Sequence, residues 1–123
     1  ASNYGAKLVM GAASVIVARG ESTIGAGASQ TDDREANGIS VSYDLGGGVK
    51  IGVSTMEATD SKDKTAAGVE EKYTANVAEV VYNIASGLDA KFTYLDFDYK
   101  AGGEAASADD SGSKSAITIS ASF

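Results

Sequence analysis

Cysteine, histidine, tryptophan and proline are all absent from the 123 residues of this chain. Without cysteine there can be neither a disulfide framework nor a thiolate metal site. Without histidine the chain lacks the most usual general base and the most usual metal ligand. The absence of proline suits a chain made mostly of paired β-strands. We therefore expect no enzyme: no catalytic residue, no cofactor and no metal site.

Long apolar runs and an excess of positive charge are also lacking. No segment approaches the roughly 18 consecutive apolar residues of a transmembrane helix, so the chain either is soluble or meets lipid as a β-barrel with alternating strands. The 17 acidic residues outnumber the 10 basic ones and give a net charge of −7, which argues against nucleic acid as a partner. The length allows one domain, so residues 1–123 are expected to form a single barrel segment.

Alternation of apolar and polar residues predicts β-strands along most of the chain. The clearest strand is Gly38 to Leu45, and the final stretch, Lys114 to Phe123, alternates in the same way and ends on an aromatic residue. Further strands are predicted at 23–29, 49–57, 71–84 and 88–100, whereas 6–19 is either one strand or two short ones broken near Gly11. The apolar phase changes partway through 71–84 and 88–100, so we predict a β-bulge in each, the first near Ala78.

The connections between these strands alternate in length. Polar loops at 30–37, 58–70 and 101–113 alternate with tight glycine turns at 46–48 and 85–87, as in an outer-membrane barrel with long external loops and short periplasmic turns. Aromatic residues lie near both ends of the strands. We interpret them as two girdles at the membrane interfaces: Tyr43, Tyr82 and Phe123 near the short turns, and Tyr73, Phe97 and Tyr99 near the long loops.

The polar phase of the strands carries Gly, Ser, Thr and scattered charges. These residues suit the lining of a water-filled channel, although the solvated outside of a soluble β-barrel has the same composition. The girdles and the loop asymmetry favour the membrane. The charged residues predicted to line the pore are Lys50, Lys72, Glu79, Asp89, Lys91 and Asp96.

Four segments make the chain resemble the C-terminal part of a Gram-negative general porin of the alphaproteobacterial type. They are N-G-I-S-V-S-Y-D-L-G-G-G-V-K at Asn37–Lys50, N-I-A-S-G-L-D at Asn83–Asp89, the Gly, Ala, Ser and Asp loop at 101–113, and the terminal A-I-T-I-S-A-S-F. The resemblance implies a 16-stranded antiparallel transmembrane β-barrel in the bacterial outer membrane, assembled as a homotrimer, through which small hydrophilic solutes and ions diffuse. It also implies contact with outer-membrane lipid, and recognition of the C-terminal strand by the barrel-assembly machinery.

Two further interpretations stay open. About seven strands are predicted, whereas bacterial barrels have even strand numbers, so we expect the chain to be the last part of a larger porin. If Tyr4 to Met10 and Ser14 to Arg19 are separate strands, the chain is instead a small eight-stranded barrel for anchoring or adhesion. A soluble β-barrel that binds a small ligand is the remaining alternative.

Overall fold

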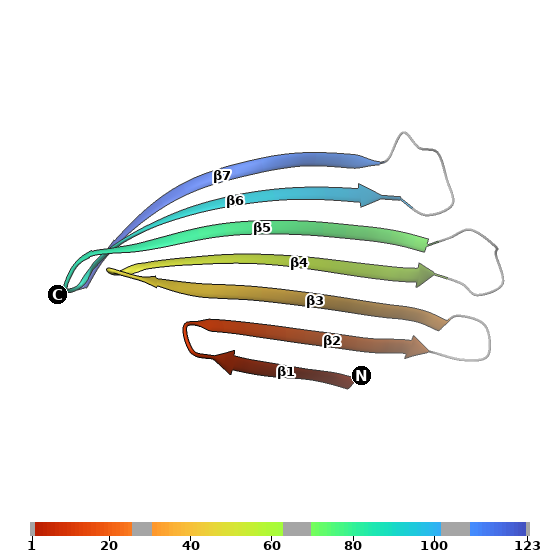
Figure 1. Cartoon of the computed structure of the whole chain (residues 1–123). Helices are drawn as coiled ribbons and strands as arrows, with labels where there is room; N and C mark the ends of the chain where they lie inside the picture. The colour runs from red at the N-terminus through yellow and green to blue at the C-terminus, as the bar shows by residue number, and fades with distance from the viewer. Residues whose placement is uncertain (1, 26–30, 63–69, 102–108, 123) are drawn as a thin grey trace.

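The computed structural model describes residues 2–25, 31–62, 70–101 and 109–122, and its regular structure is a single antiparallel β-sheet. Each strand pairs with its neighbours in sequence, so the sheet is an up-and-down meander with β1 and β7 at its two edges (Figure 1). The described residues contain no helix that is long and apolar enough to cross a membrane. The strands are β1 (Ser2–Met10), β2 (Ala13–Gly25), β3 (Thr31–Gly46), β4 (Val49–Lys62), β5 (Glu70–Ala85), β6 (Leu88–Lys100) and β7 (Asp110–Ala121).

Tight turns join the strands at one end of the sheet, here called the turn end, and the opposite end is called the loop end. Gly46, Gly47 and Gly48 connect β3 to β4 with φ angles of 77°, 61° and 82°, a region that glycine enters without steric cost. The Gly48 carbonyl accepts a hydrogen bond from the backbone N–H of Asn83 at 2.8 Å. The Gly87 carbonyl accepts one from Ser122 at 2.7 Å. The first turn is therefore joined to the end of β5 and the second to the end of β7.

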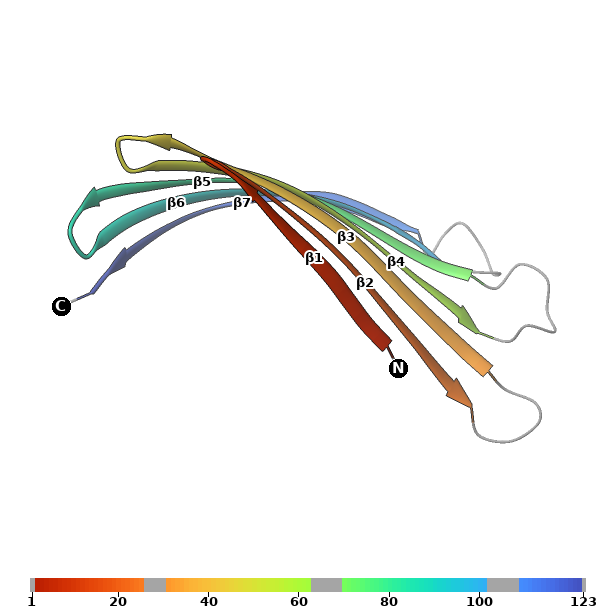
Figure 2. The same ribbon diagram turned by 60° about the horizontal axis from the view of Figure 1, so that its bottom comes forward.

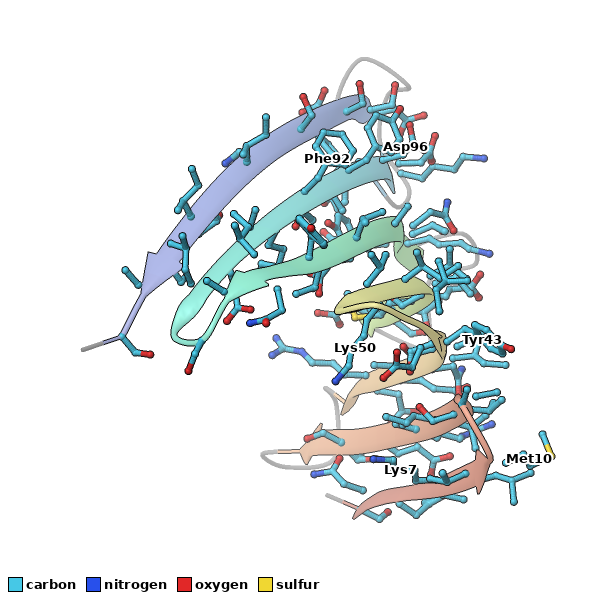
Figure 3. The ribbon with its side chains drawn as sticks, turned by 60° about the vertical axis from the view of Figure 1, so that its left-hand side comes forward. Lys7, Met10, Tyr43, Lys50, Phe92 and Asp96 are labelled. Atoms are coloured by element: carbon cyan, nitrogen blue, oxygen red, sulfur yellow. The ribbon has the colours of Figure 1, made fainter. Side chains whose placement is uncertain are left out.

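The sheet is strongly curved and therefore has a convex face and a concave face (Figure 2). Val41 pairs with Val53 in β4 and with Val15 in β2, and directly paired residues share a face. Figure 3 shows Tyr43 and Met10 on the convex side, whereas Lys50 points into the hollow of the curve. The remaining residues are assigned to a face by the strand register.

The apolar side chains of the turn-end half lie mainly on the convex face. Ala75, at 5% exposure, is the only buried hydrophobic residue among those the structure describes. Ile117 and Ile119 are 76% and 68% exposed, and Ile39, Val53 and Phe92 are exposed as well. A soluble barrel buries its apolar face on the concave side. Here curvature turns that face outward, as in a barrel surrounded by lipid.

The number of strands matches the prediction, but the first boundaries were wrong. The segment from Ala6 to Arg19 does break at Gly11, and β2 then continues without a break past Arg19 to Gly25. Thr23 to Gly25 is therefore the end of β2 and not the start of a separate strand. Residues 31–37 and 58–62, predicted as loops, are strand, because they pair with each other as the extended ends of β3 and β4.

The two predicted β-bulges are absent. Pairing of β5 with β6 is unbroken from Lys72–Lys100 to Asn83–Asp89, and the register shifts only between Asn83 and Ala85, beside the turn. Side chains alternate between the two faces of a strand. Because the register is unbroken, the change of apolar phase within β5 means that its apolar residues move from one face of the sheet to the other. On the loop-end side of Ala78, the apolar residues of β5, which are Tyr73, Ala75 and Val77, therefore lie on the concave side.

Candidate functional site

An apolar belt covers the turn-end half of the convex face. Its residues are aligned across the seven strands by the register, and the outward positions change to polar residues toward the loop end. On β3 the change falls between Ile39 and Asn37, and on β6 between Tyr94 and Asp96. The belt consists of Ala6, Leu8, Met10, Val15, Val17, Ile39, Val41, Tyr43, Ile51, Val53, Ala78, Val80, Tyr82, Phe92, Tyr94, Ile117 and Ile119.

Beyond the apolar belt, the convex face carries ion pairs. Arg19 Nη2 lies 2.7 Å from Glu21 Oε1 and 3.0 Å from Glu35 Oε2, which joins β2 to β3. Lys72 Nζ lies 2.9 Å from Glu57 Oε2 between β5 and β4. A bilayer-spanning strand needs only about 9 to 11 residues, whereas β3 and β5 each have 16. The charged part of the convex face is therefore the part that extends beyond the bilayer into water.

Four of the predicted pore-lining residues lie together on the concave face at the turn end. We call Lys50, Glu79, Asp89 and Lys91 the lumen charge group. Lys91 Nζ is 3.6 Å from Glu79 Oε2, and the same oxygen accepts a hydrogen bond from Thr93 Oγ1 at 3.5 Å. A hollow of about 530 Å³ at this end is lined by Lys50, Asp89 and Lys91 together with Asn83.

The lumen charge group carries both signs, and one of its cations is unpaired. Asp89 Oδ1 accepts a hydrogen bond from Asn83 Nδ2 at 2.8 Å. Lys50 makes no ion pair with any residue that the structure describes. Farther up the same face the side chains are small, as at Ser40, Gly52 and Ser54. Such a wall leaves open space in front of it.

The other two predicted pore-lining residues, Lys72 and Asp96, are on the opposite face. Lys72 pairs in register with Thr59, and Asp96 pairs with Asn76, so both lie on the convex side. Figure 3 shows Asp96 on the same side as Phe92, two residues away on β6. The prediction placed them in the lumen because it assumed bulges that do not exist.

The predicted aromatic girdles are placed only in part as expected. Tyr43 and Tyr82 are half-exposed on the convex face at the turn end, where a membrane interface would lie. Tyr73, Phe97 and Tyr99 are at the loop end as predicted, but on the concave face. The reason is again the unbroken register of β5 and β6. Phe123 lies outside the described residues.

Sequence reasoning did not single out several residues that the structure places in prominent positions. Tyr4 and Tyr94 are 58% and 42% exposed on the convex face and belong to the aromatic residues that meet lipid or its interface. Arg34 and Asp60 form a concave-face ion pair, with 3.0 Å between Nε and Oδ2. They were overlooked because both lie in segments predicted as loops.

Comparison with known proteins finds likeness in structure and none in sequence. No family model and no curated protein matches the chain. Two solved structures of Vibrio cholerae resemble it at 16% identity over 97% of its length: outer-membrane expressed OmpT, with a TM-score of 0.78, and its loop L8 deletion mutant, described as an outer membrane protein, with a TM-score of 0.77. The chain spans 40% and 36% of those two chains.

This likeness shows the fold. The seven strands are a segment of a bacterial outer-membrane β-barrel, with the apolar belt toward lipid and the concave face toward the lumen. The antiparallel transmembrane barrel and the outer-membrane location predicted from the sequence are thereby confirmed. At 16% identity the alphaproteobacterial type and the porin activity remain predictions.

Proposed function

We propose that this chain forms part of the wall of a porin, a non-enzymatic channel for passive diffusion of small hydrophilic solutes and ions. The observation that carries the proposal is the concave face at bilayer level. It has charges of both signs and many small side chains, such as Ser40, Gly52 and Ser54, with the aliphatic residues Ile16, Val77 and Val81 among them. Large apolar side chains would be needed to fill a barrel and close it. A wall with small polar residues instead borders water.

We further propose that the complete barrel has 16 strands and functions as a homotrimer. Both sheet edges support additional strands, because β1 and β7 each pair with only one neighbour and exposed edge hydrogen-bonding groups cannot be left in lipid. Assembly would use recognition of the C-terminal strand by the barrel-assembly machinery. Mass measurement of the detergent-purified full-length protein tests the trimer, and a monomeric mass would contradict it.

The small eight-stranded anchoring barrel, considered as an alternative, receives less support. Ser14 to Arg19 is not a separate short strand but the first half of β2, which continues to Gly25. The described residues therefore supply seven strands and not eight.

No described cluster of three or more acidic side chains is arranged to hold a metal ion.

Channel activity is tested by electrical recording from the full-length protein in planar bilayers. We expect an open channel, and we expect Lys50→Glu combined with Lys91→Glu to shift the reversal potential toward cation selectivity, because wall charges act over a Debye length of about 10 Å at 0.1 M salt. The matched control is Lys100→Glu. Lys100 lies on the convex face, in register with Lys72, so the same change of charge there should leave selectivity unchanged.

Two results would contradict the proposal. One is the absence of conductance from a correctly folded full-length protein. The other is a reversal potential that does not respond to the paired substitution, or responds equally to Lys100→Glu. Either result would favour an anchoring barrel with a closed interior.

A further inference from the structure

A second hollow lies on the concave face at the loop end, far along the strands from the lumen charge group. Its volume is about 500 Å³, within the usual range for small-molecule sites. Tyr73 and Tyr99 border it on one side, and Gly20, Ala36 and Ala58 form its floor. These five residues are in register across β2 to β6. The three small residues of the floor are thus followed, on the next two strands, by two neighbouring tyrosines.

The aromatic side of this hollow is held in place by packing. The rings of Tyr73 and Phe97 stack with centroids 6.4 Å apart and an interplanar angle of 25°. Phe97 in turn lies against Gly112 of β7, where an added Cβ would be 3.1 Å from the ring. The ring of Tyr73 is therefore fixed by a neighbour and ready to receive a ligand without first being ordered.

The polar side of the hollow is the ion pair of Arg34 and Asp60, one row beyond the small-residue floor. Arg34 Nε lies 3.0 Å from Asp60 Oδ2. The second carboxylate oxygen, Oδ1, is buried without a hydrogen-bond partner among the described residues. Such an oxygen is costly to bury unpaired. The Asp60 side chain keeps 21% of its surface exposed and lines the hollow, so Oδ2 is the carboxylate acceptor that remains for a ligand hydroxyl.

The charges select the type of ligand. An anion would meet the carboxylates of Asp60 and Glu71, which also line the hollow, and a cation would have to compete with Arg34, which already occupies Asp60. A neutral molecule with hydroxyl groups can instead accept from the guanidinium and donate to the carboxylate, while its C–H edges lie against the tyrosine rings. We propose that this hollow is a binding site for a neutral saccharide, the size of a mono- or disaccharide, at the external mouth of the channel. The position in a lumen rests on the proposed porin function.

Binding is tested with maltose as the probe on the full-length protein in detergent. Isothermal calorimetry is the readout and supplies the dissociation constant. We expect saturable binding that Tyr73→Ala weakens about tenfold, the equivalent of one lost aromatic contact. Tyr73→Phe should retain most of the affinity, because the ring is kept.

The matched control is Tyr94→Ala. Tyr94 is on β6, like Tyr99, but faces the convex side beside Ala78, so its loss should leave maltose binding unchanged. Asp60→Asn keeps an acceptor and removes the charge, and it should reduce maltose affinity by less than Asp60→Ala does. Heat-modifiable mobility in gels verifies that each variant is a folded barrel.

Three results would overturn the proposal: no saturable binding of maltose, equal loss in Tyr73→Ala and Tyr94→Ala, or binding of choline in place of maltose, which would identify a cation site. Binding does not require conductance. A channel that conducts without binding maltose therefore contradicts only this inference, whereas binding without conductance contradicts only the porin proposal.

Discussion

Ser40 and Val41 are neighbours in β3, yet they face opposite sides of the sheet. Val41 is 39% exposed on the convex face, between Val15 and Val53. Ser40 lies on the concave face, between Ile16 and Ser54. The consequence of adding a charge should therefore depend on a single step along the chain.

We predict that Val41→Arg destabilises the folded barrel in lipid by about 2 to 4 kcal/mol, the cost of a cation at the lipid-facing midplane. Ile51→Arg, on the paired strand, should cost a similar amount. Refolding titrations into bilayers of the full-length protein measure these costs. The control, Ser40→Arg, should be tolerated, because its side chain extends into water. Equal costs at Ser40 and Val41 would contradict the assignment of the faces.

Strands β5 and β6 show how an element can change the environment of its apolar residues without a bulge. Within the bilayer, the apolar residues of these strands lie on the convex face, as Val80 and Phe92 do. Beyond the bilayer, the apolar residues lie on the concave face, as Tyr73 and Phe97 do. The physical reason is that lipid surrounds the first part and water surrounds the second. Where the outside is aqueous, the convex side becomes charged and the concave side receives the aromatic residues.

The unbroken register predicts which residues of these two strands can be cross-linked. Asn76 and Asp96 are direct partners, so cysteines at both positions should form a disulfide, since paired Cα atoms about 4.5 to 5.5 Å apart meet its geometry. This chain has no cysteine of its own to compete, and any cysteine elsewhere in the full-length protein is replaced by serine. The measurement is the mobility shift of the oxidised protein on gels. Efficient cross-linking of Asn76→Cys with Leu95→Cys or Phe97→Cys instead would indicate the bulge that the register lacks.

Much of the sheet could be predicted from the sequence, because alternation and glycine turns are local signals. They located the turns at 46–48 and 85–87, and they placed Lys50, Glu79, Asp89 and Lys91, among six pore-lining candidates, on the polar face of the strands. The faces of Lys72 and Asp96 could not be predicted. A change of apolar phase is produced equally by a bulge and by a change of surroundings, and only the pairing of β5 with β6 distinguishes them. Arg34 and Asp60 were missed because polar strand ends outside the bilayer have the composition of loops.

At the scale of the whole molecule, one curved sheet separates three environments. Lipid meets the apolar belt, external water meets the ion pairs of Arg19 and Lys72, and the lumen meets the concave wall. A single-layer sheet with almost no buried hydrophobic residue gains little from its own packing. Its stability must come from strand hydrogen bonds and from lipid against the convex face. This division of environments is the central claim.

A nitroxide scan along β4 tests that claim most directly. This chain lacks cysteine, so single cysteines at positions 49 to 54 carry a unique label once any cysteine elsewhere in the full-length protein is replaced by serine. Collision with oxygen or with a water-soluble nickel chelate then reports lipid or water. In the full-length protein in bilayers, we predict that oxygen accessibility is highest at Val49, Ile51 and Val53, and nickel accessibility at Lys50, Gly52 and Ser54. The opposite phase, or no alternation, would contradict the account.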